Sequence, residues 1–277
     1  MPQTMFSAEP MIRLGCFLLV LASVALWELL APRRVQRIAR ARRWPANLGV
    51  MVLDTIVVRL LFPVTAVGIA ILAQAKGWGL FSVLPAPQWV ALAGSLLLLD
   101  LAIYTQHVAF HYVPPLWRLH RMHHADLEFD VTTGLRFHPV EIALSMLIKF
   151  AAIILLGAPP TAVMIFEVML NATSMFNHGN VRLLARLDDL LRWIVVTPDM
   201  HRVHHSVLWR ETNSNFGFNL PWWDRLFGTY RAQPEAGHEQ MSIGIDRFRD
   251  PVELRLDRML LQPFRSAGSA PNGNDGD

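Results

Sequence analysis

Long apolar segments separated by short polar ones set the pattern of this chain. The apolar segments cover residues 11–30, 48–75, 89–108, 140–156 and 161–175. A helix needs about 20 apolar residues to cross the hydrocarbon core of a bilayer. The pattern therefore predicts several membrane-spanning helices. The last two segments form a hairpin, because Gly-Ala-Pro-Pro at 157–160 ends one helix before the next begins.

The basic residues predict how these helices are oriented. A basic run follows the first apolar segment where a cleaved signal peptide would have small residues, so the segment is interpreted as a permanent membrane helix. Basic residues beside a membrane helix are typical of its cytoplasmic end. We therefore expect the N-terminus outside, and all the histidines and the C-terminal part on the cytoplasmic side. The run consists of Arg33, Arg34, Arg37, Arg40, Arg42 and Arg43.

Composition agrees with a membrane protein and excludes other classes. Hydrophobic residues make up 53% of the 277 residues and charged residues only 17%, against about 25% charged in an average soluble domain. The net charge of +3 is small and the arginine run follows a membrane segment, so nucleic-acid binding is rejected. The single cysteine, Cys16, excludes a disulfide scaffold and any site built from paired cysteines.

The histidines are the candidate chemical groups. His-Arg-x-His-His occurs twice, at 120–124 and 201–205. Residues three and four apart share one face of a helix, so each motif can direct its imidazoles to one point. A lone histidine is usually a hydrogen-bonded core residue, and His238 in the polar tail is interpreted in that way. The other ten are predicted metal ligands: His107, His111, His120, His123, His124, His138, His178, His201, His204 and His205.

Ten imidazoles are more than one metal ion can use. Imidazole suits zinc, iron, copper and nickel, and a tetrahedral zinc ion takes four ligands. Burying so many titratable groups without a function would be costly. The simplest interpretation is a cage for two metal ions, with each His-Arg-x-His-His motif as one helical wall.

Several polar residues near the histidines are predicted to orient them. Asp100 lies two helical turns before His107 and can share its face, and a carboxylate there is a candidate partner for an imidazole N–H. Glu141 and Asp199 are weaker candidates for the same role. Asn213 belongs to a predicted turn that seats the last helix, and its direct ligation of a metal is the less favoured alternative.

A buried ion pair is predicted within the hairpin. Lys149 and Glu167 lie at about equal distances from the Gly-Ala-Pro-Pro turn, so antiparallel arms would place them at a similar depth. An isolated charge there would be expensive, and we therefore expect the two side chains to pair.

The motifs together resemble the fatty acid hydroxylase/sterol desaturase superfamily of membrane di-iron oxygenases. The resemblance covers roughly residues 50–232, and it implies O2-dependent attack on a C–H bond of a lipid. It also implies two iron ions, with zinc an option in a purified form, and electrons from an external NAD(P)H-linked reductase. The matching segments are HVAFH (107–111), HRMHH (120–124), TTGLRFHPVE (132–141), NHGN (177–180), TPDMHRVHH (197–205) and TNSNFGFNLPWWDRLFGTY (212–230).

Three alternatives stay open. The same cage could desaturate a lipid, because both reactions begin with hydrogen abstraction. A membrane di-zinc hydrolase would use similar ligands, although Arg121 and Arg202 occupy the position of the glutamate in His-Glu-x-x-His. A haem protein needs only one or two axial ligands and leaves most histidines unexplained.

The expected architecture is an all-α, polytopic membrane bundle with a cytoplasmic helical cap that carries the dimetal site. Residues 1–45 are predicted to form a membrane helix and a basic segment, 46–232 the catalytic domain, and 233–277 a polar tail with a disordered end. No electron-transfer motif is found, so an electron-transfer protein is expected to dock on the cytoplasmic face. The preference for arginine over lysine suggests a bacterial plasma membrane.

Overall fold

The computed structural model of the chain describes residues 9–84 and 86–265, so the predicted disorder from residue 266 onward falls outside it. All named elements in these ranges are helical, which confirms the all-α prediction. The longer helices are α2 (Glu9–Leu30), α3 (Arg40–Leu61), α4 (Ala66–Lys76), α6 (Gln88–Tyr112), α7 (Pro114–His124), α8 (Pro139–Leu156) and α9 (Pro160–Asn177). The shorter ones are α5 (Leu80–Val83), η1 (Thr133–Leu135), α10 (Ala185–Leu191), α11 (Pro198–His204), α12 (Trp209–Thr212), α13 (Trp222–Leu226), α14 (Gly237–Gln240), η2 (Pro251–Leu254), α15 (Leu256–Leu261) and η3 (Gln262–Phe264).

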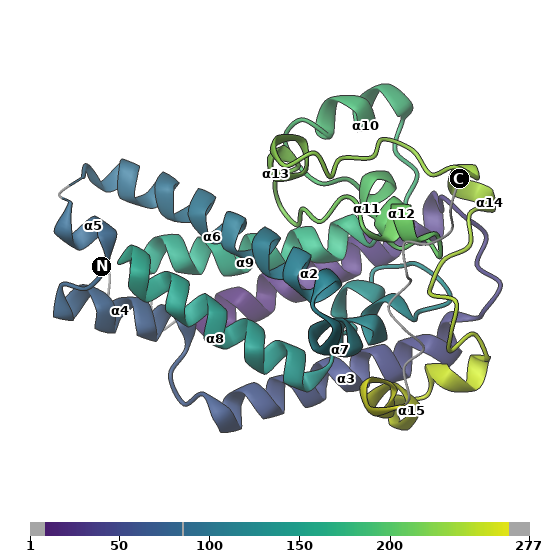
Figure 1. Cartoon of the computed structure of the whole chain (residues 1–277), viewed down its shortest axis with the longest axis horizontal. Helices are drawn as coiled ribbons and strands as arrows, with labels where there is room; N and C mark the ends of the chain where they lie inside the picture. The colour runs from purple at the N-terminus through teal and green to yellow at the C-terminus, as the bar shows by residue number, and fades with distance from the viewer. Residues whose placement is uncertain (1–8, 85, 266–277) are drawn as a thin grey trace.

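The helices form a bundle with a cap at one end. α4, α6, α8 and α9 run beside one another, and the short helices other than α5 gather past one end of them (Figure 1). We call residues 113–137 and 178–265 the cap. Four segments are long and apolar enough to cross a membrane: Glu9–Leu30, Arg40–Val83, Gln88–Tyr112 and Pro139–Leu156. The side of the membrane on which the cap lies stays a prediction.

The apolar segment 48–75 is divided between two helices. α3 begins earlier, at Arg40, and ends at Leu61, two residues before Pro63. Proline has no N–H to continue the helical ladder and disfavours the helical conformation of the residue before it. α4 restarts at Ala66, where the side chain of Thr65 accepts a hydrogen bond from the Gly68 amide. The chain therefore bends at this point, and α4 continues away from the cap until Gly79 meets the α8–α9 turn at Gly157.

The hairpin turn is present as predicted. α8 ends at Gly157, whose φ of 62° is the left-handed conformation that glycine adopts freely. A Cβ on Gly79 would lie 2.0 Å from the Gly157 amide nitrogen, so the two glycines let the α4–α5 loop pack directly on the turn.

α9 differs from the apolar helix that we expected. It has the same length as α8, 18 residues, yet it is not among the four candidate spans. Its lower hydropathy comes from polar residues such as Glu167, Asn171 and Asn177. Glu167 and Asn177 are buried within the structure. Glu167 and Asn177 therefore face protein rather than lipid, whereas Asn171 is exposed.

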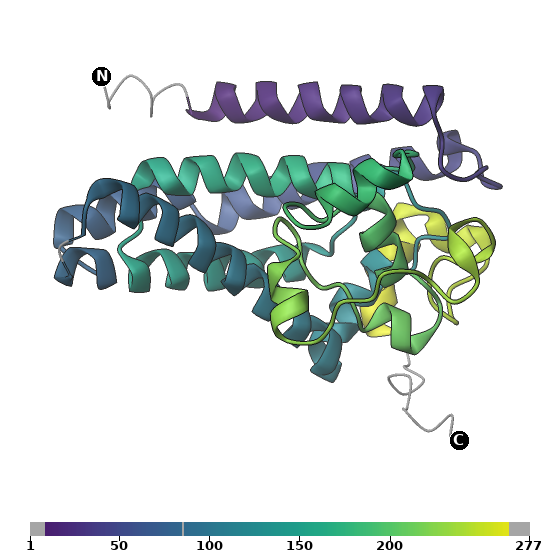
Figure 2. The ribbon, with the colours of Figure 1, turned by 90° about the horizontal axis from the view of Figure 1, so that it is seen from above.

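α2 forms a separate layer over α9 (Figure 2). Most of its surface is exposed, and two charged residues attach it to the rest of the protein. Near one end, Arg13 pairs with Glu167 at 2.8 Å. Near the other, the buried carboxylate of Glu28 accepts hydrogen bonds from the amides of Val131 (2.7 Å) and Asn180 (2.8 Å). These contacts fix α2 against the cap as well as against the bundle.

The arginine run has protein partners. Arg33 pairs with Asp199 at 3.1 Å, and Arg34 donates to the Met241 carbonyl at 2.8 Å. Arg43 is fully buried and pairs with Asp126 and Asp130 at 2.7 and 2.5 Å. The run therefore joins the N-terminal helices to the cap.

The predicted pair in the hairpin is confirmed, since Lys149 Nζ lies 2.9 Å from Glu167 Oε1. Lys149→Met and Glu167→Gln are expected to destabilise the protein less together than the sum of their separate effects, with a coupling of about 1 kcal/mol or more. Arg13 limits the cost of Lys149→Met because it keeps one partner beside Glu167. Unfolding in mixed detergent micelles measures the cycle. Additive effects would contradict the pairing, and Lys76→Met, at an exposed site, is the control.

Candidate metal centre

α7 and α11 place the two His-Arg-x-His-His motifs opposite each other. Each helix begins with proline in its first turn, where a missing N–H is tolerated. The side chain of Thr197 caps α11 by accepting a hydrogen bond from the Met200 amide. α11 ends at His204, so its last turn and the residue after it carry all three histidines of the second motif.

Nine buried histidines form two adjacent groups. Within each group, all the ligand atoms lie within 4.8 Å of one another. Each motif contributes to both groups. In the first motif, His123 belongs to one group, and His120 and His124 belong to the other. In the second motif, His204 belongs to one group and His205 to the other. The groups are His107, His111, His120, His124 and His204 (group one), and His123, His178, His201 and His205 (group two).

Hydrogen bonds fix which nitrogen carries the proton in five of these rings. In each, Nδ1–H donates to a protein oxygen, which leaves Nε2 unprotonated and free to bind a metal. The acceptors are the Phe216 carbonyl for His107 (2.7 Å), Glu141 Oε1 for His120 (2.6 Å), the Arg136 carbonyl for His123 (3.2 Å), the Ser174 carbonyl for His178 (2.7 Å) and the Ser214 carbonyl for His204 (2.7 Å).

The inward nitrogens fit metal ions. His107 Nε2 lies 3.1 Å from His120 Nε2 and 3.0 Å from His204 Nε2. In group two, His178 Nε2 lies 3.1 Å from the Nε2 atoms of His123 and His205. Ligand nitrogens about 2.0–2.1 Å from one ion stand about 3 Å apart when they are at right angles. Unprotonated nitrogens at this distance have no hydrogen to share, whereas a cation would satisfy them all.

Unpaired nitrogens support the same interpretation. Both ring nitrogens of His111 and of His124 are buried and have no hydrogen-bond partner. Buried polar atoms normally have partners, and a bound ion is one partner that could satisfy these nitrogens. The donor set of both groups, imidazole nitrogen alone, suits a transition metal.

Burial keeps the imidazoles of the cap neutral. It lowers the pKa of His120 to about 3. The pKa values of four further rings lie well below the ordinary value. Burial is the larger cause and the neighbouring imidazoles are the smaller one, for His123, His124, His204 and His205. Only the neutral ring can bind a metal, so these residues are ready as ligands at pH 7.

An aromatic shell encloses the histidines. Phe137 stacks on His123 with centroids 4.4 Å apart, Phe129 lies 5.1 Å from His205, and Trp117 lies 5.0 Å from His111. These rings keep water from the centre and fix the imidazole planes. These rings could not be predicted from the sequence, because nothing among its 15 phenylalanines and 9 tryptophans distinguishes those that touch a histidine.

The segment 213–224 supplies two of the carbonyl acceptors. Asn215 has a positive φ of 52°, and its amide donates to the Met200 and Arg231 carbonyls. The carboxylate of Asp224 accepts hydrogen bonds from the Phe216 and Gly217 amides at 2.7 and 2.9 Å. A Cβ on Gly217 would meet Asp224 Oδ2 at 2.7 Å, so the turn requires glycine.

Of the predicted orienting residues, Glu141 and Asn213 lie beside a histidine of the centre. Glu141 accepts from His120 as described, and Asn213 lies against His111. Asp100 instead accepts hydrogen bonds from Asn219 (2.7 Å) and the Trp223 indole (2.8 Å).

Three further residues lie away from both groups. Asp199 binds Arg33 and Arg202. His138 caps α8 by accepting from the Val140 amide, and its other nitrogen donates to the Leu260 carbonyl at 3.3 Å. The structure therefore does not bring this predicted ligand to the other nine. His238 is buried and lies 3.6 Å from Asp199.

A buried ionic network supports the segment between α7 and η1. Burial disfavours ionisation of Asp126, but the charges of Arg43 and Arg136 overcome it and lower the pKa of that carboxyl below its usual range. Arg136 donates to the Met122 carbonyl at 2.8 Å, and its own carbonyl holds His123. The network thus links α3 to group two.

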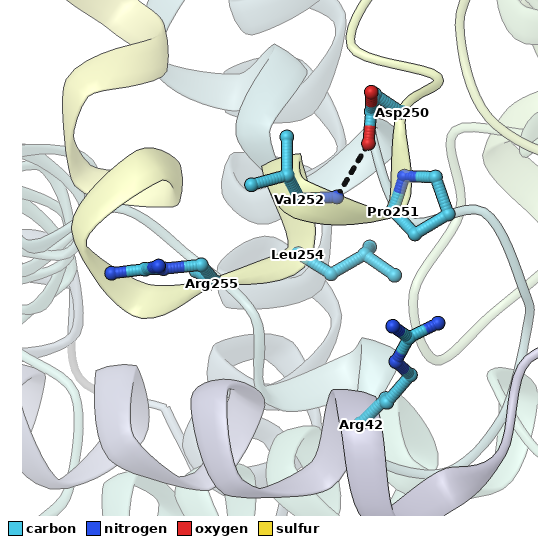
Figure 3. Close-up of a pocket in the computed structure, with 6 residues that line it drawn as sticks. All are labelled: Arg42, Asp250, Pro251, Val252, Leu254 and Arg255. Carbon is cyan, nitrogen blue, oxygen red and sulfur yellow. Dashed lines mark hydrogen bonds between the residues drawn. The ribbon is translucent and has the colours of Figure 1, made fainter.

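One surface pocket is separate from this centre. Its volume is about 430 Å³, and it is lined by Arg42 and residues of the C-terminal segment (Figure 3). None of its lining residues is a histidine. It therefore has no part in the candidate metal site.

Because neighbouring residues belong to different groups, single substitutions are expected to empty one group at a time. His204→Ala should remove metal from group one and His205→Ala from group two, each leaving about half of the wild-type metal content. Metal analysis of the purified proteins by mass spectrometry measures this. His238→Ala, which changes a buried histidine outside both groups, should keep the full content. Retention of all metal by both ligand variants would contradict the assignment.

Glu141→Gln tests the orienting role of a carboxylate. The amide oxygen can still accept from His120 Nδ1, but it is a weaker acceptor than the carboxylate oxygen, so the imidazole becomes a weaker ligand. Removal of such a partner typically weakens metal binding about 10–100-fold. Competition with a chelator measures the affinity. Asp199→Asn is the control, and an equal loss in both variants would indicate a general structural effect.

The sequence that forms the metal centre is similar to known proteins. The fatty acid hydroxylase family matches residues 92–229, about half of the chain. The ornithine lipid hydroxylase OlsE of Rhizobium tropici is 30% identical over 173 residues, which are 62% of this chain and 50% of that protein. Human alkylglycerol monooxygenase is 26% identical over 162 residues, 58% of this chain and 35% of that protein.

A further relative is the fatty acid hydroxylase vlmA of a Lecanicillium species, 27% identical over 172 residues, which are 57% of this chain and 44% of that protein. The chain thus spans half or less of the length of these relatives. No solved structure matches it significantly. The match to residues 92–229 includes both histidine motifs, and with these relatives it shows that the chain belongs to the fatty acid hydroxylase superfamily.

Proposed function

We propose that this protein is a membrane-bound, O2-dependent oxidoreductase that hydroxylates a C–H bond of a lipid. The observation that carries the proposal is the division of nine buried histidines into two adjacent all-imidazole groups. Two iron ions are the proposed occupants, and zinc could replace them in a purified form. The names of the relatives, a lipid hydroxylase and a monooxygenase, support the same class of reaction.

The residues of the chain prepare the site for this chemistry. Bound iron would supply a redox-active centre able to activate O2 for attack on an unactivated C–H bond. The Nδ1–H hydrogen bonds hold five rings in the ligand tautomer before any metal arrives. Phe129, Phe137 and Trp117 exclude water, which limits side reactions of a strong oxidant.

The remaining assignments follow from the membrane setting. A lipid with an acyl or alkyl chain, or a sterol-like lipid, would enter laterally from the bilayer. We assign residues 46–232 to the catalytic domain and place the cap on the cytoplasmic side of a multi-pass protein, in the plasma membrane if the source is bacterial. Electrons would come from an external protein linked to NAD(P)H that docks on the cap.

Two other reactions are distinguishable. A desaturase of the same superfamily would use the same histidines. A di-zinc hydrolase is less favoured because neither of the two groups in the described residues includes a carboxylate to act as a general base. The single carboxylate bonded to a ring of the groups, Glu141, lies on the outer, Nδ1 side of His120.

Lipid mass spectrometry of cells that express the wild-type protein or His204→Ala tests the proposal. We expect a lipid that is one oxygen atom heavier only in cells that express the wild type or the His238→Ala control. When the cells are given isotope-labelled O2, this lipid should carry the heavy oxygen isotope. A lipid lighter by two hydrogens would identify a desaturase instead. No O2-dependent lipid change, despite a full metal content, would contradict both and favour the hydrolase.

A further inference from the structure

A large apolar surface lies on the cap, outside the four candidate membrane spans. It extends over α10, the segment that follows it and α13, at one edge of the cap (Figure 1). Its side chains are 43–78% exposed. Single exposed apolar residues are ordinary, but a contiguous group indicates a binding surface. We call this group the α10–α13 surface: Leu184, Leu187, Leu190, Trp193, Ile194, Trp222, Leu226 and Phe227.

Specific contacts hold the two parts of the surface together. The Trp222 indole donates to the Trp193 carbonyl at 2.7 Å. The guanidinium of Arg225 lies over the Trp193 ring at 4.0 Å and over the Tyr230 ring at 4.1 Å. It also donates to the Arg192 carbonyl at 3.1 Å. The exposed rings are therefore fixed in position from beneath.

The surface lies beside a membrane-spanning helix and not beyond its end. Phe227 stacks on Tyr104 of α6 with centroids 5.5 Å apart, and the Trp223 indole donates to Asp100 of the same helix. Tyr104 precedes the end of α6 by eight residues, or about 12 Å along the helix axis. α13 therefore contacts α6 within its membrane-spanning length.

The other end of α6 gives an independent measure of depth. Trp89 opens the helix and is 72% exposed, as expected of an aromatic anchor at the opposite membrane surface. From Trp89 to Tyr104 is about 22 Å at the rise of an α-helix. The hydrocarbon core is about 30 Å thick. Phe227, stacked on Tyr104, is thus placed within the lipid and not in the water above it.

We propose that the α10–α13 surface is immersed in the bilayer, at the boundary between the acyl chains and the head groups. Its two tryptophans have the residue type that prefers this boundary. The exposed Arg182 and Arg186 lie at and just beyond its N-terminal end, where they can reach the head groups. Lipid is favoured over a second protein because the surface packs against α6, a membrane-spanning helix whose Leu97 and Leu98 are exposed. One side of the cap is therefore sunk into the membrane.

Spin labels at single cysteines test this placement without depending on catalysis. Cys16→Ala removes the one cysteine of the chain, and Leu190→Cys, Ile194→Cys and Leu226→Cys then introduce labels at exposed positions whose substitution leaves the core intact. The full-length protein is placed in lipid nanodiscs. Relaxation by O2, which concentrates in lipid, is compared with relaxation by a water-soluble nickel chelate. Leu155→Cys on the exposed face of α8 is the lipid control, and Asp257→Cys on the cap is the water control.

We expect the three labels to resemble Leu155→Cys, with high O2 and low nickel accessibility. Labels that resemble Asp257→Cys would overturn the proposal. Low accessibility to both agents, with dipolar broadening between labels, would also overturn it and identify a contact with a second copy of the chain. Metal content, measured on the same samples, should equal that of the wild type, so a failure of the proposed placement is distinct from a failure of the metal centre.

Discussion

Nine imidazoles cannot be buried together unless every ring nitrogen has something to bind, and the rest of the structure depends on this constraint. Five rings satisfy it on their outer side by donating to fixed oxygens, which turns the other nitrogen inward without a proton. The inward nitrogens of these five rings then stand 3.0–3.1 Å apart within each group. A cluster of this kind is stable only around cations, so folding and metal binding are expected to be coupled.

The acceptors of those hydrogen bonds are positioned from all parts of the chain. Asp224 holds the turn that presents the carbonyls of Ser214 and Phe216. Arg43, on α3, holds Asp126 and Asp130 beside the segment that presents the Arg136 carbonyl. Glu28 reaches from α2 to the amide of Asn180, two residues after His178. Helices that contribute no ligand thus determine the orientation of the ligands.

The sequence predicted the helical class, the hairpin turn, the Lys149–Glu167 pair and, among its ten predicted ligands, the nine histidines that the structure brings together. These features have a local signal, either periodicity or a strong helix stop. His138 has the same residue type but serves as the cap of α8, because it immediately precedes the proline that opens this helix. Spacing alone cannot separate a capping imidazole from a ligand. The Phe216 carbonyl that holds His107 and the Arg43 network were not predictable, because they depend on contacts between residues more than 80 positions apart.

The division of each His-His pair between the two groups has a consequence for how the chain can vary. Successive residues on an α-helix point about 100° apart, so the separation of the two groups is set by the helical repeat and not by loop lengths. An insertion of one residue within either motif would rotate every following imidazole to the other group or away from both. Loops can lengthen at the edges of the cap, but the two five-residue motifs can vary only by substitution.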